Sequence, residues 1–113
     1  MTMLRSKFYN DFPIGTPQGI HEFMMNRHYI DSAIEKGDFD AIALTVDFDY
    51  AYARTAITER QRMAIDLIYH QGITQREAGE IMGISQQAVQ QMLNHVMKRI
   101  AASYRRSYNK GVS

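Results

Sequence analysis

Residues 74–100 carry two helix-start signals with a glycine between them, and the spacing of these three features strongly restricts the local fold. Thr74 and Glu77, three positions apart, form a capping box in which each side chain satisfies a free backbone N–H of the other residue. Gly83 can adopt the left-handed conformation that ends a helix at no steric cost. Ser85 is a preferred N-cap for the next helix. The stretch therefore predicts two helices joined by a tight turn, the helix-turn-helix plan.

The second of these helices has two contrasting faces. Apolar residues recur at steps of three and four and give one buried face: Val89, Leu93, Val96 and Ile100. The opposite face is polar and almost free of acid: Gln86, Gln87, Gln90, Gln91, Asn94 and Lys98. Such a face is typical of a helix that enters the major groove of DNA. An ordinary helical hairpin with a solvated amide face is the alternative. In the first helix, the small Ala78 suits a close helix crossing, and Ile81 and Met82 are expected to point into the core.

Composition restricts the function further. With 113 residues the chain is long enough for one compact domain, and it has no cysteine, which excludes disulfides and cysteine-based zinc sites. It has no apolar run long enough to span a membrane, so we expect a soluble, cytoplasmic protein. The first 56 residues hold five basic against eight acidic side chains, and the remaining 57 hold eight against four. The basic C-terminal half suits a polyanion, and the acidic N-terminal half suits a protein partner.

The sequence before residue 57 predicts an irregular arm followed by two helices. Residues 1–15 contain Phe8, Tyr9 and Phe12 with no helical period and are expected to form the arm. Thr16 and Pro17 mark the start of a helix that should end at Gly37. Asp38 should cap a second helix to about residue 54, along which apolar residues keep a helical period: Phe39, Ile42, Ala43, Val46, Tyr50 and Ala53. A strand through residues 42–48 is the competing interpretation, which the four alanines between residues 41 and 53 disfavour.

A third helix should begin at Thr58, which forms a capping box with Gln61, and end at Gly72. Ala64 and Ile65 face inward, whereas Met63 and Leu67 lie on another side. That second apolar side is expected to meet the N-terminal helices or a partner. The fold prediction is all-α with about five helices: an arm at 1–15, an acidic helical segment at 16–56, a helix-turn-helix domain at 57–104 and a basic tail at 105–113.

The residues of this domain resemble a known family. T-E-R-Q-R at 58–62, the glycine turn at 72–74 and G-I-S-Q-Q-A-V-Q-Q at 83–91 resemble region 4 of sigma-70-type bacterial RNA polymerase sigma factors. The resemblance covers roughly residues 57–101. Response regulators share a similar module, but the Val89–Leu93 spacing and the pair Lys98 and Arg99 favour the sigma factors. In that family the helix opened at Ser85 reads the promoter −35 element, and another face of the domain holds the flap of the polymerase β subunit.

The resemblance implies roles for individual residues. The base-reading positions are Gln86, Gln87, Gln90 and Gln91, and the phosphate-contacting positions are Thr74, Arg76, Ser85, Asn94, Lys98 and Arg99. The family commonly has arginine and glutamate at several reading positions. Glutamine instead suits bidentate contacts to adenine, which makes an A/T-rich target a hypothesis. Met63 and Leu67 form the possible partner face.

The 56 residues before this domain are too few to melt a promoter, as a complete sigma factor does. Short phage and prophage regulators with a region 4-like domain behind an acidic helical segment are a closer likeness. We therefore expect a DNA-binding transcription activator that also binds bacterial RNA polymerase. The alternatives are a dimeric helix-turn-helix repressor and a phage protein that inhibits host polymerase. The scattered histidines and acids offer no convergent catalytic or metal-binding set, so we expect no enzyme, metal or cofactor.

Overall fold

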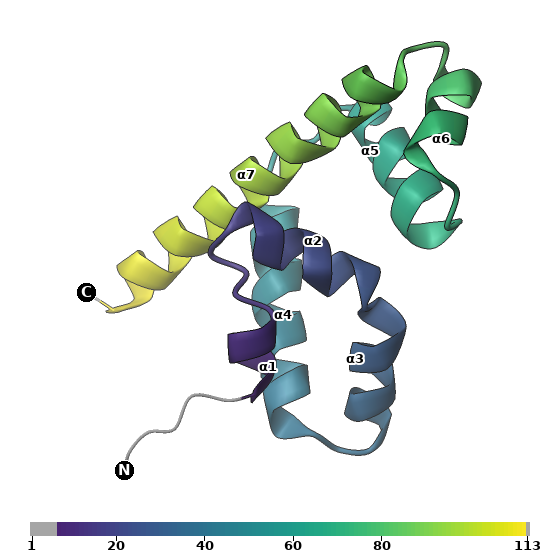
Figure 1. Ribbon diagram of the computed structural model, residues 1–113. Helices are drawn as coiled ribbons and strands as arrows, with labels where there is room; N and C mark the ends of the chain where they lie inside the picture. The colour runs from purple at the N-terminus through teal and green to yellow at the C-terminus, as the bar shows by residue number, and fades with distance from the viewer. Residues whose placement is uncertain (1–6, 113) are drawn as a thin grey trace.

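The computed structural model describes residues 7–112, with side chains to residue 107, and this part of the chain is all-α. Figure 1 shows a long helix, α7, that carries a helix-turn-helix at one end and a group of shorter helices along its length. The elements in chain order are α1 (Lys7–Asp11), α2 (Pro17–Met25), α3 (Arg27–Glu35), α4 (Phe39–Ala53), α5 (Glu59–Ile65), the π-helical segment η1 (Asp66–His70), α6 (Gln75–Met82) and α7 (Gln86–Val112).

The helix-start signals of the sequence are all confirmed. The side chain of Thr16 accepts a hydrogen bond from the backbone of Gly19, and Asp38 accepts from two backbone N–H groups at the start of α4. Thr58 and Thr74 each form a complete capping box, with both reciprocal bonds present. These bonds satisfy backbone donors that a helix leaves free in its first turn.

The described residues contain seven α-helices instead of the expected five, for two reasons. The arm expected to be irregular contains α1, whose Phe8 is buried in the core. The helix expected from residue 16 to 36 divides at Asn26, whose side-chain amide donates to the carbonyl oxygen of Glu22 at 2.8 Å. An asparagine side chain that competes for backbone groups in this way favours a break in a helix.

The last helix is longer than expected. Instead of ending near Tyr104, α7 continues to Val112.

The core lies along α7, which packs against α2, α4, α5 and α6. The buried apolar residues of α7 are Val89, Leu93, Val96, Met97, Ile100 and Ala101. A second layer joins α2 to α4, where the rings of Phe23 and Phe48 stack with their centroids 4.4 Å apart. We call residues 7–54, which form α1 to α4, the N-terminal body. No helix in the described part of the chain is both long and apolar enough to cross a membrane.

Helix α4 is a helix, as expected, but the apolar period noted in its sequence marks its exposed side. The residues that α4 buries are Ala41, Leu44, Phe48 and Ala51, while Phe39 is 83% exposed and Val46 60% exposed. The small Ala41 and Ala51 let neighbouring helices approach closely, which explains why this side faces inward. On α6 the expectation for Ile81 was also wrong, because α6 buries Ala78, Gly79 and Met82 and leaves Ile81 exposed.

Two glycines make the turn between α6 and α7 possible. Gly83 has a φ of 73°, a left-handed conformation that favours glycine. Gly79 is tightly packed, since a Cβ atom there would lie 2.6 Å from the carbonyl oxygen of Ile84 and 3.2 Å from the carbonyl carbon of Ser85. The backbone N–H of Ile84 also donates to the carbonyl oxygen of Gly79 at 2.9 Å. The turn thus folds directly onto the bare backbone of α6.

The substitution Gly79→Ala should therefore lower the free energy of unfolding, by about 1–3 kcal/mol as for other overpacked sites. Urea denaturation followed by circular dichroism measures this change. The matched control is Gly15→Ala, because a Cβ at Gly15 would meet only ordinary contacts at 3.6 Å or more. The control should leave the stability unchanged or raise it by up to about 1 kcal/mol. Equal effects of the two substitutions would mean that the turn has room for a methyl group.

Two half-buried tyrosines, Tyr9 and Tyr69, link the stability of the fold to alkaline pH. Burial raises the pKa of Tyr69 to about 12, and burial together with the hydrogen bond to Asp47 raises the pKa of Tyr9. A group whose pKa is raised on folding contributes stability that is complete below its unfolded pKa. That contribution is lost as the pH rises toward the folded pKa, here from pH 10 toward pH 12 for Tyr69.

The free energy of unfolding should consequently fall between these pH values, with a slope of at most about 1.4 kcal/mol per pH unit for each tyrosine. In the variant Tyr69→Phe the fall should be shallower, because one of the two ionisable groups is absent. Urea denaturation at several alkaline pH values measures the slope, and Tyr29→Phe, which removes an exposed hydroxyl, is the control. A slope unchanged by Tyr69→Phe would contradict the assignment.

Candidate nucleic-acid interface

The polar side chains of α7 that the sequence singled out lie on one open surface. Gln86, Gln87, Gln90, Gln91, Asn94 and Lys98 are all exposed, and we call these six residues the reading face. On the opposite side of α7, the buried Val89, Leu93 and Val96 pack the helix against the core. No residue from 86 onward is acidic, so α7 presents no carboxylate to an approaching phosphate backbone.

The expected phosphate-contacting residues differ in their exposure and in the hydrogen bonds and ion pairs they already make. The hydroxyl oxygen of Thr74 accepts from the backbone N–H of Glu77 at 3.1 Å, and that of Ser85 accepts from Ala88 at 3.0 Å. A hydroxyl that accepts in this way still has its own proton to donate to a phosphate oxygen. Arg76 is well exposed and lies 4.0 Å from Glu80, an ion pair too long and too solvated to hold it firmly. Lys98 is exposed, whereas Arg99 is half-buried.

The helix-turn-helix is fixed by a contact that the sequence analysis missed. The Arg60 guanidinium donates from Nη2 to the carbonyl oxygen of Met82 at 3.2 Å. That oxygen is one of the carbonyls that the end of a helix leaves without a partner. Arg60 thus connects α5 to the last residue of α6, immediately before the turn. Local sequence signals did not reveal this bond, because its partners are 22 positions apart.

The N-terminal body reaches the edge of the reading face. A polar hollow of about 230 Å³ is lined by residues of α2, α6 and α7, among them Gln18, His21, Gln75, Gln90 and Asn94. His21 Nδ1 lies 2.6 Å from the hydroxyl oxygen of Tyr69, which ties α2 to the π-helical segment. Gln18 and His21 therefore join the candidate interface. No local signal could have predicted them, since only the packing of α2 on α7 brings them there.

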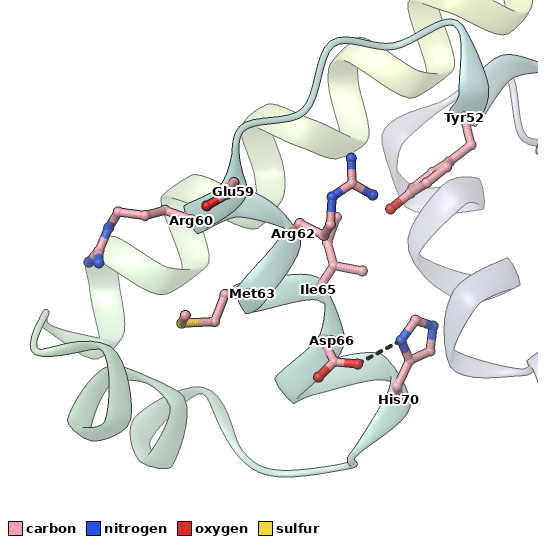
Figure 2. Close-up of a pocket in the computed structure, with 8 residues that line it drawn as sticks. All are labelled: Tyr52, Glu59, Arg60, Arg62, Met63, Ile65, Asp66 and His70. Carbon is pink, nitrogen blue, oxygen red and sulfur yellow. Dashed lines mark hydrogen bonds and ion pairs between the residues drawn. The ribbon is translucent and has the colours of Figure 1, made fainter.

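A second hollow lies on the side of the domain formed by α5. It has a volume of about 620 Å³ and is lined by Tyr52, Glu59, Arg60, Arg62, Met63, Ile65, Asp66 and His70. Figure 2 shows Tyr52, from the end of α4, opposite Arg62 and His70, with Met63 on the α5 side. His70 Nδ1 lies 3.1 Å from an Asp66 oxygen, and hydrogen bonds from Gln71 and His70 hold the pKa of Asp66 below its usual value.

Met63 and Leu67, the two residues of the possible partner face, differ in their exposure to solvent. Met63 is 46% exposed and is not covered by the N-terminal helices. Leu67 is only 7% exposed and belongs to the hydrophobic core, so its assignment to an accessible partner face was wrong. Leu67 follows Met63 by four residues and lies roughly 40° farther around the helix, toward the buried Ala64, so it faces the core while Met63 faces outward.

Comparison with known proteins agrees with this geometry. Residues 56–102 match the family described as Sigma-70, region 4, a range that contains α5, η1, α6 and α7 as far as residue 102. No curated protein matches the chain, and no solved structure does. The match includes both capping boxes, the Gly83 turn and the whole reading face. Residues 56–102 therefore form a sigma-70 region 4-like helix-turn-helix domain, which indicates a DNA-binding, transcription-related function.

Proposed function

We propose that this protein is a sigma-like transcription regulator that binds promoter DNA through α7 and also binds bacterial RNA polymerase. The observation that carries the proposal is the reading face, an exposed, acid-free row of amides in a region 4-like domain. In this proposal it acts in the bacterial cytoplasm, as the short phage and prophage activators with a region 4-like domain do. We propose a binding role, with no catalytic step.

Glutamine side chains would determine the sequence preference of the reading face. Gln86, Gln87, Gln90 and Gln91 are exposed, and each offers an amide donor and an amide acceptor. That pair matches the N6 and N7 edge of adenine, whereas guanine presents two acceptors in the same groove. An A/T-rich element is the target that this chemistry favours. The hydroxyls of Thr74 and Ser85, with Arg76, Asn94 and Lys98, would hold the phosphates on either side.

The hollow beside α2 would widen the footprint on DNA. Gln18 and His21 line the same space as Gln90 and Asn94, so a duplex docked on α7 would pass close to α2. This contact would distinguish the protein from an isolated region 4 domain.

The polymerase would dock away from the reading face. The family resemblance assigns this role to a surface that holds the flap of the β subunit, and the hollow around Met63 is the apolar depression that suits it. Arg62, Glu59 and His70 surround Met63 with polar groups, as the rim of an interface requires.

A stand-alone dimeric repressor is the second candidate. The observation that favours it is the exposed apolar side of α4, which a second copy of the chain could cover. A protein that inhibits the polymerase would share the Met63 hollow but would bind DNA weakly. Direct binding measurements separate these functions.

On DNA, the variant Gln90→Ala or Gln91→Ala should lose preference for the selected site over a scrambled one, by about 1–3 kcal/mol for each bidentate contact removed. Selection of bound duplexes followed by fluorescence anisotropy measures this difference. Asn10→Ala, which removes an exposed amide on α1, is the control and should keep the preference. An equal loss on both duplexes would show that the two glutamines do not read bases.

For phosphates, Lys98→Ala should weaken binding to every duplex and lower the slope of log affinity against log salt by about one unit. Lys36→Ala, an exposed lysine at the end of α3, should leave the slope unchanged. If both variants keep the slope of the unmodified protein, Lys98 makes no phosphate contact.

For the polymerase, the full chain should co-migrate with core RNA polymerase on a sizing column and fail to do so when the β-flap tip is deleted. Met63→Lys should reduce this binding at least about tenfold, because it places a charge in the apolar hollow. Met25→Lys is the matched control, since Met25 is 55% exposed on α2 and lies outside the hollow. Absence of co-migration would turn the assignment toward the repressor.

A further inference from the structure

Helix α4 presents a second apolar face to solvent. Its inner side is packed against α1, α3 and α7, and no element of the described chain covers its outer side. The large residues of that side are Phe39, Ile42, Val46 and Tyr50, which are 83%, 36%, 60% and 54% exposed. A helix that is apolar on both sides is normally buried on both sides. The outer face of α4, which these four residues form with Ala53, is therefore expected to have a partner.

The spacing of this outer face is symmetric about its central residue. From Val46, the face extends four positions back to Ile42 and seven back to Phe39, and four forward to Tyr50 and seven forward to Ala53. All five positions lie on one side of a helix, because steps of three and four residues keep to one face. If two copies of α4 pair antiparallel, each position meets the position at the opposite offset. Phe39 then faces the small Ala53, Ile42 faces Tyr50, and Val46 meets itself.

The charges beside the outer face favour the same arrangement. Asp40 in the first turn of α4 and Arg54 at its C-cap lie on the same side of the helix and at opposite ends. In a symmetric antiparallel pair, residues on the same side meet across the contact, so Arg54 approaches Asp40 of the second copy at both ends. In a symmetric parallel pair, Asp40 and Arg54 of the second copy would lie on the opposite side of the contact, so this charge pairing would not form. Arg54 already lies over the Tyr50 ring, 5.1 Å from its centroid, next to the face.

The other two acids of α4 have partners within the chain. Asp47, which lies near the centre, accepts a hydrogen bond from the Tyr9 hydroxyl at 2.6 Å and is thereby held toward α1. Asp49 lies 3.9 Å from the Arg27 guanidinium on the other flank. Across the pair, Asp49 would face Ile42 and Thr45, so no carboxylate is placed against another there.

We propose that a second copy of this chain covers the outer face of α4, forming a symmetric dimer in which the two helices run antiparallel with Val46 at the twofold axis. The contact is self-complementary, as an interface with twofold symmetry requires. It is also small, since it joins two helices about 22 Å long, and an interface of this size supports dissociation constants no tighter than about micromolar. This inference goes beyond the proposed function, because it requires neither DNA nor polymerase.

Sedimentation equilibrium of the full chain tests the proposal. The unmodified protein should pass from monomer to dimer as its concentration rises through the micromolar range. Val46→Arg should remain a monomer throughout, since it buries two like charges at the axis. Circular dichroism melting confirms that the variant is folded. A monomeric unmodified protein would overturn the proposal, and so would a dimer that Val46→Arg leaves intact.

A charge exchange tests the antiparallel geometry. Asp40→Arg and Arg54→Asp should each weaken self-association at least about tenfold, because like charges then meet at both ends. A mixture of these two variants should form heterodimers, and the double variant Asp40→Arg/Arg54→Asp should regain the dimer. Arg106→Asp, which changes an exposed arginine of α7, is the control. Failure of both the mixture and the double variant to associate would overturn the antiparallel arrangement. Val46 lies outside the reading face and the Met63 hollow, so loss of the dimer and loss of the proposed function are measured separately.

Discussion

The structure depends on one apolar stripe along α7. At its Gln86 end α7 is packed against α5 and α6, and farther along it is packed against α2 and α4. Two groups of helices therefore bury apolar side chains against the same stripe of α7. Because the two groups share a single straight element, the helix-turn-helix and the N-terminal body form one continuous hydrophobic core. Removal of either group would expose part of α7 that the other cannot cover.

This shared helix also explains how a nearly neutral chain can suit a polyanion. The formal net charge is only +1, yet the acids are concentrated in the N-terminal half and α7 has none. Of the two acids on α6, Glu77 closes its capping box, and Glu80 lies 4.0 Å from the basic Arg76. Distribution, more than total charge, decides what potential a docking surface presents. The fold places its acids mainly on helices that flank α7.

Sequence alone predicted the parts of the fold that depend on neighbouring residues. The starts of α2, α4, α5, α6 and α7 were found because an N-cap is a bond between residues two or three positions apart. The left-handed Gly83 was found for the same reason, since its role depends on its own backbone. The reading face could also be recognised, because the apolar stripe opposite to it has an unambiguous helical period.

The features that sequence missed depend on distant contacts. Helix α4 is apolar on both sides, so its period could not say which side packs on α1, α3 and α7. The break at Asn26 coincides with one side-chain hydrogen bond, and the π-helical segment at Asp66–His70 has no sequence signature of its own. Gln18 and His21 reach the interface only because α2 crosses α7. In each case tertiary packing selected among options that were locally equivalent.

The continuity of α7 has a consequence for the proposed DNA interface. Ile100, packed among the N-terminal helices, and Gln86, at the reading end, belong to the same rigid rod and are about 21 Å apart along its axis. A tilt of about ten degrees at the packed end would displace the reading end by about 3.6 Å, close to the length of one base-pair step. The packing of α2 and α4 on α7 therefore helps to set the orientation of the Gln86 end of the helix. If α7 reads bases as proposed, this packing would also influence the register in which they are read.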